Sequence, residues 1–332
     1  MPAEELPKKV RMSIGSAIVL GLSEGRLDAL PTTVYMLTYR RSKCSASCAF
    51  CPQSKTSSGR ADMLSRVIWP AFPTTEVIAR IAEAFETGNI LRVCVQALNY
   101  ANVQSDLINL AKMIRASCKM SISVSCQPLT RQKMQALAEV GVNRVSIALD
   151  AATEELFDKV KGAYVGGPYR WKSHLAALEE AVEIFGWNNV STHLIAGLGE
   201  REEDFVKIIQ KCVDMGVCPA LFAFTPVPGA AMNNSSPPSV NYYRRMQLAQ
   251  YLITHGSTRF ERMKFENERL IDFGVQKVKL KRIVKTGEPF QTSGCPRCNR
   301  PYYNERPGGP IYNYPRKLTE SEVSEIEKVL CL

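Results

Sequence analysis

Three cysteines near the N-terminus have the spacing of a metal site. Cys44, Cys48 and Cys51 lie in the segment RSKCSASCAFCPQ, with three and then two residues between them. Thiolates are soft ligands that select zinc or iron–sulfur clusters. Three thiolates bind three irons of a [4Fe-4S] cubane and leave the fourth iron open. A structural zinc ion needs a fourth ligand and a catalytic one usually recruits histidine or carboxylate, so the spacing favours the cluster.

A second group of cysteines lies near the C-terminus. Cys295 and Cys298 form a CxxC in the basic, proline-rich segment SGCPRCNRPYYNERPGGP, and Cys331 is the penultimate residue. CxxC occurs in zinc knuckles, redox pairs and iron–sulfur sites. We predict a second iron–sulfur cluster here, a [4Fe-4S] centre, with Cys331 as a third ligand and Ser293 as a candidate fourth. The alternatives are zinc or no metal at the CxxC, and a buried apolar thiol at Cys331.

The cysteine usage indicates metal sites rather than a disulfide scaffold. The chain has eleven cysteines in 332 residues, and its three histidines, His174, His193 and His255, are not paired at ligand spacing. Secreted disulfide scaffolds are short and rich in cysteine, which this chain is not. Any cluster would therefore be held by thiolates.

The elements that must position these cysteines alternate along the chain. Short runs rich in β-branched or aromatic residues predict strands at 32–39, 90–98, 120–126, 144–149, 190–196 and 220–225. Helical periodicity predicts helices at 75–86, 105–116, 131–139, 170–185, 202–215 and near 242–254. Strand then helix, repeated six times, predicts an α/β fold of parallel strands. Such strands form a full or partial barrel or an open sheet, and in a barrel the active site lies at their carboxyl ends.

The alternation of predicted strands and helices divides the chain into three segments. We expect an N-terminal extension at 1–30, a barrel at 31–255 and a C-terminal extension at 256–332 that carries the second cluster. Within this last part, residues 275–284 have a basic, strand-like pattern and residues 292–315 form a loop rich in glycine, proline and tyrosine. Thr319 and Glu322 have the spacing of a capping box, which predicts a final helix.

The composition is that of a folded, soluble protein. Hydrophobic residues make up 45% of the chain, charged residues 22%, and the mean hydropathy is −0.13, which excludes disordered, collagen-like and fibrous proteins. The apolar stretch 14–22 is far shorter than the ~20 residues of a membrane helix. Pro2, Glu4 and Glu5 precede it and no cleavage site ends it, which argues against a signal peptide. We predict a cytoplasmic protein without a membrane contact.

The net charge of +10 lies in the two end segments. Residues 1–60 hold nine basic against four acidic residues, and residues 256–332 hold fifteen against ten. Such surfaces attract nucleic acid, anionic lipid or an acidic protein, and the count alone does not choose among them. A solvated positive face without a partner is the alternative.

The CxxxCxxC pattern, with Phe50 directly before the third cysteine, resembles the signature of the radical S-adenosylmethionine (SAM) enzymes. The resemblance implies a [4Fe-4S] cluster on Cys44, Cys48 and Cys51 whose open iron chelates the amino and carboxylate groups of SAM. A low-potential electron donor then drives cleavage of SAM to methionine and a 5′-deoxyadenosyl radical, which abstracts hydrogen from an unactivated carbon. It also implies a partial (β/α)6 TIM-like barrel, in agreement with the six predicted strands.

Further segments resemble the biotin-synthase-like members of that family. Asp150, in SIALDAAT at the end of the fourth predicted strand, stands where these members place a carboxylate on the SAM ribose. HLIAGLGE resembles the fifth-strand motif GxIxGxxE through Ile195, Gly197 and Glu200, with His193 in place of the first glycine.

Two more cofactor contacts follow from the same resemblance. LFAFTPVPG resembles the segment that lines the adenine, which implies a backbone contact at Val227 before the turn at Gly229. The usual Gly-Gly-Glu motif of the second strand is absent. Gln96 and Asn99 stand in its place and are assigned the contact with the SAM amino group by position.

Across nearly the whole chain the pattern most resembles a subunit of the archaeal-type, two-component lipoyl synthase. SIGSAIVLGL, TSGCPRCNRPYYNERPGGPIYNYP and the late cysteine carry this resemblance. It implies sulfur insertion at C6 or C8 of an octanoyl chain on a lipoyl carrier protein or domain. A second radical SAM subunit would be the partner and the second cluster the sacrificed sulfur donor. Lipoyl carriers are commonly acidic, which suits the basic end segments.

Two other cysteines fall at positions with a meaning in biotin synthases. Cys94 and Cys126 stand where those enzymes place two ligands of a sacrificial [2Fe-2S] cluster, but the third such position is Ser191. The missing ligand argues against biotin synthase itself. We therefore assign Cys94 and Cys126 to the core.

Three functions remain in view. The leading hypothesis is a radical SAM sulfurtransferase that acts on a carrier-bound octanoyl group. The second is another biotin-synthase-like reaction in which the C-terminal cluster only transfers electrons. The third is a zinc-containing nucleic-acid-binding or RNA-modifying protein whose CxxC loop stacks bases on its tyrosines. Against the third, the positive charge follows no helix continuously and the sequence shows no appended RNA-binding domain.

Overall fold

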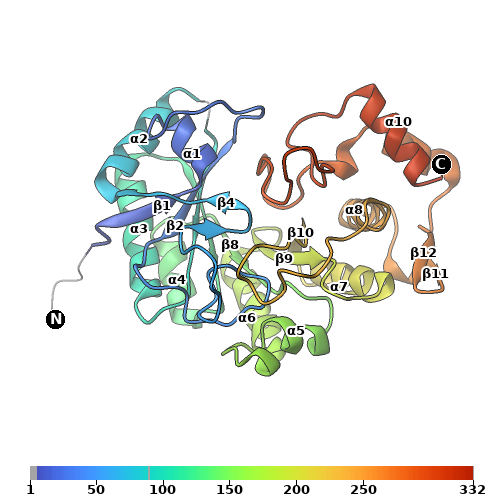
Figure 1. Cartoon of the computed structure of the whole chain (residues 1–332), viewed down its shortest axis with the longest axis horizontal. Helices are drawn as coiled ribbons and strands as arrows, with labels where there is room; N and C mark the ends of the chain where they lie inside the picture. Colours follow the sequence, from blue (N-terminus) through green and yellow to red (C-terminus); the bar gives the residue numbers. More distant parts are fainter. Residues whose placement is uncertain (1–5, 89, 332) are drawn as a thin grey trace.

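The computed structural model describes residues 6–88 and 90–331, and its main feature is one eight-stranded sheet (Figure 1). The strand order is β10-β9-β8-β7-β6-β2-β1-β5. Six neighbouring strands are parallel: β2 (Thr33–Thr38), β6 (Arg92–Gln96), β7 (Ser121–Cys126), β8 (Arg144–Ile147), β9 (Val190–Ala196) and β10 (Val217–Ala223). The prediction of an α/β fold with the six parallel strands of a partial TIM-like barrel is confirmed.

Helices connect these strands, as predicted. They are α2 (Thr74–Glu86), α3 (Val103–Ser117), α4 (Arg131–Glu139), α6 (Trp171–Phe185), α7 (Glu202–Asp214) and α8 (Val240–Thr254). In α3 the buried residues Leu107, Leu110 and Ile114 recur every three or four positions, so one stripe of the helix packs on the sheet. The α4 and β9 bounds agree with the predicted ranges, and the other elements differ by a few residues.

The parallel strands have two different faces. Side chains such as Val34 and Val93 belong to the main core between sheet and helices. Their neighbours Tyr35, Cys94 and Gln96 point the other way and line a cavity inside the barrel. Because side chains alternate along a strand, polar residues and cysteines can gather in the interior without disturbing the outer core.

The N-terminal segment belongs to the main sheet. Strand β1 (Lys9–Met12) pairs antiparallel with β2 and with β5 (Ala71–Pro73). Helix α1 (Ile14–Val19) follows, and the Ser13 side chain caps it by accepting a hydrogen bond from the Ser16 amide. The predicted extension 1–30 is thus joined to the barrel from residue 9 onward, while its residues 1–5 lie outside the described residues. A small hairpin, β3 (Met63–Leu64) with β4 (Val67–Ile68), precedes β5.

The C-terminal region corrects one prediction. The strand expected at 275–284 is wrong, since these residues form helix α9 (Lys277–Lys285). Leu280 and Val284 are four residues apart and buried together, so the packing has helical period although lysine and apolar residues alternate at the start of the segment. The region also contains β11 (Lys264–Glu266), β12 (Arg269–Asp272) and α10 (Glu320–Val329). Short 3₁₀ turns occur at Ala163–Val165, Phe260–Arg262 and Glu288–Phe290.

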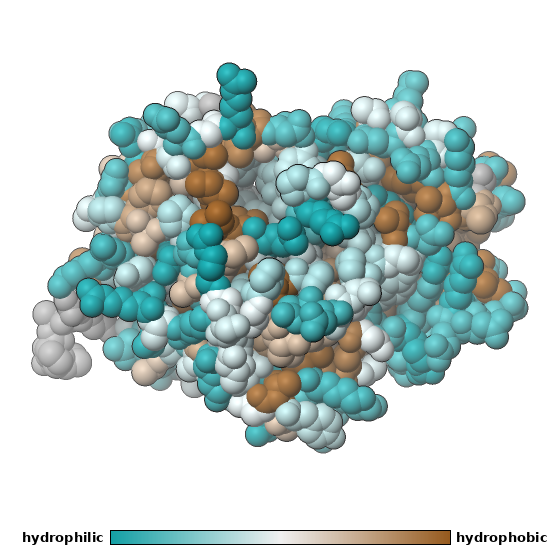
Figure 2. Space-filling view, viewed as in Figure 1, coloured by the Kyte–Doolittle hydropathy of each residue, from teal (hydrophilic) through white to brown (hydrophobic). Residues whose placement is uncertain are grey.

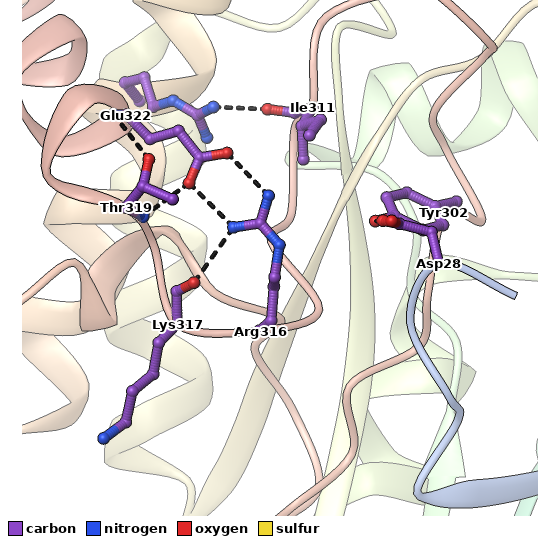
Figure 3. Close-up of polar contacts among 8 residues, drawn as sticks. Asp28, Tyr302, Ile311, Arg316, Lys317, Thr319 and Glu322 are labelled. Atoms are coloured by element: carbon purple, nitrogen blue, oxygen red, sulfur yellow. Dashed lines mark hydrogen bonds and ion pairs between the residues drawn. The ribbon is translucent and has the colours of Figure 1, made fainter.

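The final helix and the loop before it are fixed by polar contacts (Figure 3). The predicted capping box at Thr319 and Glu322 is confirmed. Arg316 also donates to both carboxylate oxygens of Glu322 at 2.9 Å. Earlier in the same loop, the hydroxyl of Tyr302 donates a hydrogen bond to the Asp28 carboxylate. The loop thereby connects α10 with the N-terminal segment.

The surface is mainly polar. On the face shown in Figure 2, hydrophilic residues surround separate apolar patches. No helix in the described part of the chain is both long and apolar enough to cross a bilayer.

The close approach of two loops at Gly229 generates a prediction about stability. Gly229 has φ +84°, and a Cβ there would lie 2.1 Å from the backbone nitrogen of Gly59. Gly256 has a similar φ of +62°, but a Cβ there meets nothing within 4 Å. We expect Gly229→Ala to lower the free energy of unfolding by about 2 kcal/mol more than Gly256→Ala. Urea denaturation of both variants measures the difference, and equal losses would contradict the importance of the contact.

Candidate functional site

One cavity inside the barrel, of about 270 Å³, brings the two cysteine groups together. The predicted site residues that line it are Cys44, Cys48, Phe50, Cys51, Gln96, Asn99, Asp150, His193, Cys295 and Cys298. They come from segments up to 254 positions apart in the sequence, from Cys44 to Cys298. Within the described chain, the predicted residues Glu200, Val227 and Cys331 lie outside this lining.

The loop of Cys44, Cys48 and Cys51 follows β2, and its own side chains fix it by hydrogen bonds to its backbone. Lys43 donates three hydrogen bonds of 2.6–3.0 Å to backbone carbonyls between residues 52 and 59. The buried Gln53 amide donates to two more carbonyls, at 2.7 and 2.6 Å. Fixed side chains at both ends make the loop a preorganised frame for a ligand.

Two thiols of this loop, those of Cys48 and Cys51, are protonated when no metal is bound. Burial raises the pKa of Cys48 far above its usual value and raises that of Cys51 to about 12. The Asn99 amide donates to the sulfur of Cys44 at 3.1 Å, so Asn99 contacts the site through its backbone. A metal that binds here must displace protons, which couples binding to pH.

The donor set of three thiols is suited to an iron–sulfur cluster, because thiolates are the ligands that such clusters take. A cubane spaces its ligands more widely than one ion does, and the amide donor at Cys44 supplies the type of hydrogen bond that stabilises cluster sulfurs.

Asp150 stands at the carboxyl end of β8 in an unusual backbone conformation. Its φ is +68°, its amide donates to the His193 carbonyl at 2.7 Å, and its carbonyl accepts from Ile195 at 2.8 Å. These bonds fix Asp150 to β9. Its carboxylate therefore projects into the cavity at a defined position.

Lys161 is a functional candidate that the sequence reasoning missed. It follows helix α5 (Glu154–Val160), which was also not predicted, and its side chain is fully buried. Its ammonium lies 2.7 Å from the Asp150 carboxylate and also donates to the Ala148 carbonyl. The ring of Tyr169 stands 5.2 Å away, in cation–π contact. A buried, fully paired ion pair of this type holds the carboxylate in one orientation.

The side chain of His193 lines the cavity and is uncharged. Burial lowers the pKa of its imidazole to about 4, so the ring carries no charge at neutral pH. Its centroid lies 4.7 Å from that of Phe222. The residue that replaces the expected glycine therefore fills space beside the cavity with an aromatic pair.

Glu200 and Val227 form hydrogen bonds within the loops around the cavity. The Glu200 carboxylate accepts from the amides of Gly197 and Leu198, at 2.6 and 2.9 Å, and from the Tyr242 hydroxyl. The Val227 carbonyl accepts from the Ala230 amide at 3.1 Å. Their contacts with a cofactor stay predictions, and a role in shaping loops is what the contacts support.

The second pair lines the same cavity from the C-terminal loop. The Cys298 amide donates to the Cys295 carbonyl at 3.1 Å, which forms a turn, and the Cys298 sulfur is 3.0 Å from the Tyr35 hydroxyl. Tyr35 is in register with Cys94 on the neighbouring strand. Burial raises the pKa of Cys94, and the nearby thiols of Cys295 and Cys298 add to the effect. The structure thus brings Cys94 to the predicted second site, although its sequence position suggested a core residue.

The loop that carries the CxxC bridges the two ends of the parallel array. On the β2 side, the Asn299 side chain accepts from the Thr32 amide at 3.0 Å. On the β10 side, the Ser293 hydroxyl accepts from the Leu221 amide at 2.8 Å, and Arg300 donates to the Leu221 carbonyl at 3.1 Å. The loop therefore links the residue before β2 to the free edge of β10. Ser293, the candidate fourth ligand, faces the strand backbone through this bond.

The prediction that Cys331 joins this pair is not supported. Cys331 is exposed in a separate groove with Leu270 and Leu280. Helix α10 buries Ile326 and packs against α9 and α8, which keeps the end of the chain on that side of the molecule (Figure 1).

The raised pKa values generate a prediction about thiol reactivity. Because only the thiolate reacts with iodoacetamide, we expect limited alkylation of the metal-free protein at neutral pH to label the exposed Cys331 before Cys48 and Cys51. Labelling of Cys48 and Cys51 should increase as the pH rises. Peptide mass mapping measures the order, with Cys331→Ser as the control. Labelling of Cys48 as fast as Cys331 would contradict the burial of the site.

Comparisons with known proteins agree with this geometry. Residues 41–212 match the model of the family described as the radical SAM superfamily. An uncharacterized protein of Methanocaldococcus jannaschii, MJ0785, is 27% identical over 166 residues, which cover 48% of this chain and 42% of the relative.

Solved structures show a similar fold. HydG, a maturase of the [FeFe]-hydrogenase, matches with a TM-score of 0.52 and 14% identity over 64% of this chain and 48% of its own. Methylornithine synthase (PylB) also has a TM-score of 0.52, with 13% identity over 67% of this chain and 62% of its own. The chain spans less than half of the length of MJ0785 and of HydG.

The family match covers more than half of the chain and includes all three cysteines of the loop after β2. The parallel sheet that carries this loop is shared with the solved structures. The chain belongs to the radical SAM superfamily.

Proposed function

We propose that this protein inserts sulfur into an octanoyl chain attached to a lipoyl carrier protein or domain, together with a second radical SAM subunit. The observation that carries the proposal is the common cavity of the two cysteine groups. A carbon radical must meet a sulfide before it is quenched, so a sulfur donor has to face the first cluster across the substrate. A CxxC that lines the same cavity as the CxxxCxxC loop supports this arrangement.

Membership of the superfamily implies a [4Fe-4S] cluster and SAM. Cys44, Cys48 and Cys51 would hold the cluster, and the Asp150 carboxylate is suited to accept hydrogen bonds from a ribose diol. Bound there, the cluster would supply one electron for the cleavage of SAM to methionine and a 5′-deoxyadenosyl radical, which would take one hydrogen atom from the substrate carbon. Cys295 and Cys298 would hold the second cluster, which would supply the sulfide for this carbon and take up one electron. A low-potential donor resupplies the first electron.

The cavity wall between the two cysteine groups is suited to an alkyl chain. Leu37, Leu98 and Phe224 line it, and the uncharged His193 adds no charge to it. Apolar walls bind methylene groups and exclude water, which would otherwise compete for a reactive intermediate. A carrier-bound octanoyl chain is therefore a better fit than a polar substrate.

The basic surface supports an acidic carrier as partner. Helix α9 exposes Lys277, Lys279 and Arg282 within six residues. Charge of one sign on one helix attracts a partner of the opposite sign and speeds its association. Lipoyl carriers are small and commonly acidic.

The assignment of the two cysteine groups generates a test by variants. We expect Cys48→Ala to abolish cleavage of SAM by the reduced protein. Cys295→Ala with Cys298→Ala should lower the iron content of the reconstituted protein from about eight to about four per chain. It should also abolish the mass gain from sulfur on an octanoylated lipoyl domain that is incubated with the protein and its sister subunit.

The control for this test is Cys118→Ala, which removes a buried thiol at the end of α3. It should keep the iron content and the mass gain. Robust formation of 5′-deoxyadenosine without any mass gain in the unaltered protein would contradict the proposed substrate.

The Asp150 site generates a second prediction. We expect Asp150→Asn to weaken SAM binding by about tenfold, because an amide replaces a charged acceptor for the ribose. Asp158→Asn is the matched control, since that carboxylate accepts from the Ala163 amide on the neighbouring helix end. Equilibrium dialysis with the reconstituted protein measures both affinities. Equal affinities would remove Asp150 from the binding site.

A further inference from the structure

Cys94 approaches the CxxC pair from a rigid strand. It lies on β6 beside Tyr35 of β2, and the Tyr35 hydroxyl is 3.0 Å from the Cys298 sulfur. Cys94 and Cys298 pack against the same small apolar cluster, which consists of Tyr35, Leu37, Trp69, Leu98 and Tyr303. Cys94, Cys295 and Cys298 all line the central cavity. One wall of the cavity therefore carries three thiols from two distant segments.

We propose that Cys94 is the third thiolate ligand, with Cys295 and Cys298, of the second iron–sulfur cluster. The inference rests on the proposed function, which supplies that cluster. Two ligands then come from a turn of the C-terminal loop and the third from the centre of a strand. A cluster held in this way joins the loop to the barrel wall and faces the cavity.

The other cysteines are less suitable as third ligand. Cys218 on β10 directs its thiol to the Gly294 carbonyl at 3.5 Å and lines an outer groove behind the loop. Cys126 at the end of β7 also lines the central cavity, but its side chain packs in the main core and not on the aromatic cluster of Cys298. Cys331 is in a different groove altogether. Cys44 of the CxxxCxxC loop also packs on the aromatic cluster of Cys298, and outside that loop Cys94 is the described cysteine that combines this packing with a place on the inner wall.

The charges around Cys94 suit an anionic cluster. Arg92 lies two residues before Cys94 on the same face of β6 and donates to the Ser123 hydroxyl at 2.9 Å. The Arg300 amide donates to the Tyr35 hydroxyl at 3.0 Å, and its guanidinium stands 3.7 Å from the centroid of Phe222. Three thiolates on a cluster bring negative charge into a buried place, which requires nearby cations. Arg92 and Arg300 supply them.

The test is the iron and sulfide content of the full chain after anaerobic reconstitution, with electron paramagnetic resonance of the reduced clusters. We expect about eight irons in the unaltered protein and about four in Cys94→Ala, with loss of the second spectral component. Cys126→Ala is the matched control, a cysteine on the adjacent strand, and should keep about eight. Cys94→Ser, which conserves the volume, should lose the irons or keep them with a changed spectrum.

The possible failures are distinguishable. About four irons in the unaltered protein would remove the second cluster and with it the proposed function. About eight irons and an unchanged spectrum in both Cys94 variants would overturn the ligand assignment alone and leave the proposed function in place.

Discussion

The connection that the C-terminal loop makes between the β2 and β10 sides of the sheet is the constraint on which the rest of the structure depends. Six parallel strands do not surround a cavity on their own, and β10 presents an edge with free backbone groups. The C-terminal loop satisfies that edge through Ser293 and Arg300 and reaches β2 through Asn299. The same segment that seals the barrel also carries the CxxC. The contacts that attach this loop to the sheet therefore also fix the position of the second cysteine group.

Burial determines the protonation state of cysteines in both groups when no metal is bound. Low polarity raises the pKa of Cys48, Cys51, Cys94 and Cys298, so the metal-free cavity holds neutral thiols. Each cluster that binds would convert thiols to thiolates and bring charge inside. The buried cation of Lys161 lies beside one group, and the half-buried Arg92 and the buried Arg300 lie beside the other, where they can balance that charge. Cluster binding and the stability of the fold are linked for this reason.

The sequence predicted the parts of the molecule whose signal is local. Strand β9 and helix α4 follow from β-branched runs and from periodicity, and the CxxxCxxC loop follows from spacing alone. Helix α9 was missed because lysine and valine alternate at its start, while its packing depends on Leu280 and Val284 at helical spacing. Lys161 and Cys94 could not be found in this way. Their partners Asp150 and Cys298 are brought to them by tertiary structure.

In the proposed reaction, sulfur passes through the central cavity from the CxxC pair to a substrate carbon that is activated at the CxxxCxxC loop. The most direct measurement uses protein whose clusters are assembled with heavy-isotope sulfide and a reaction mixture that contains only natural sulfur. Mass spectrometry of the octanoylated carrier domain after reduction and addition of SAM should find the heavy isotope in the product. A product that carries only natural sulfur, or a carrier that gains none while SAM is consumed, would contradict the account.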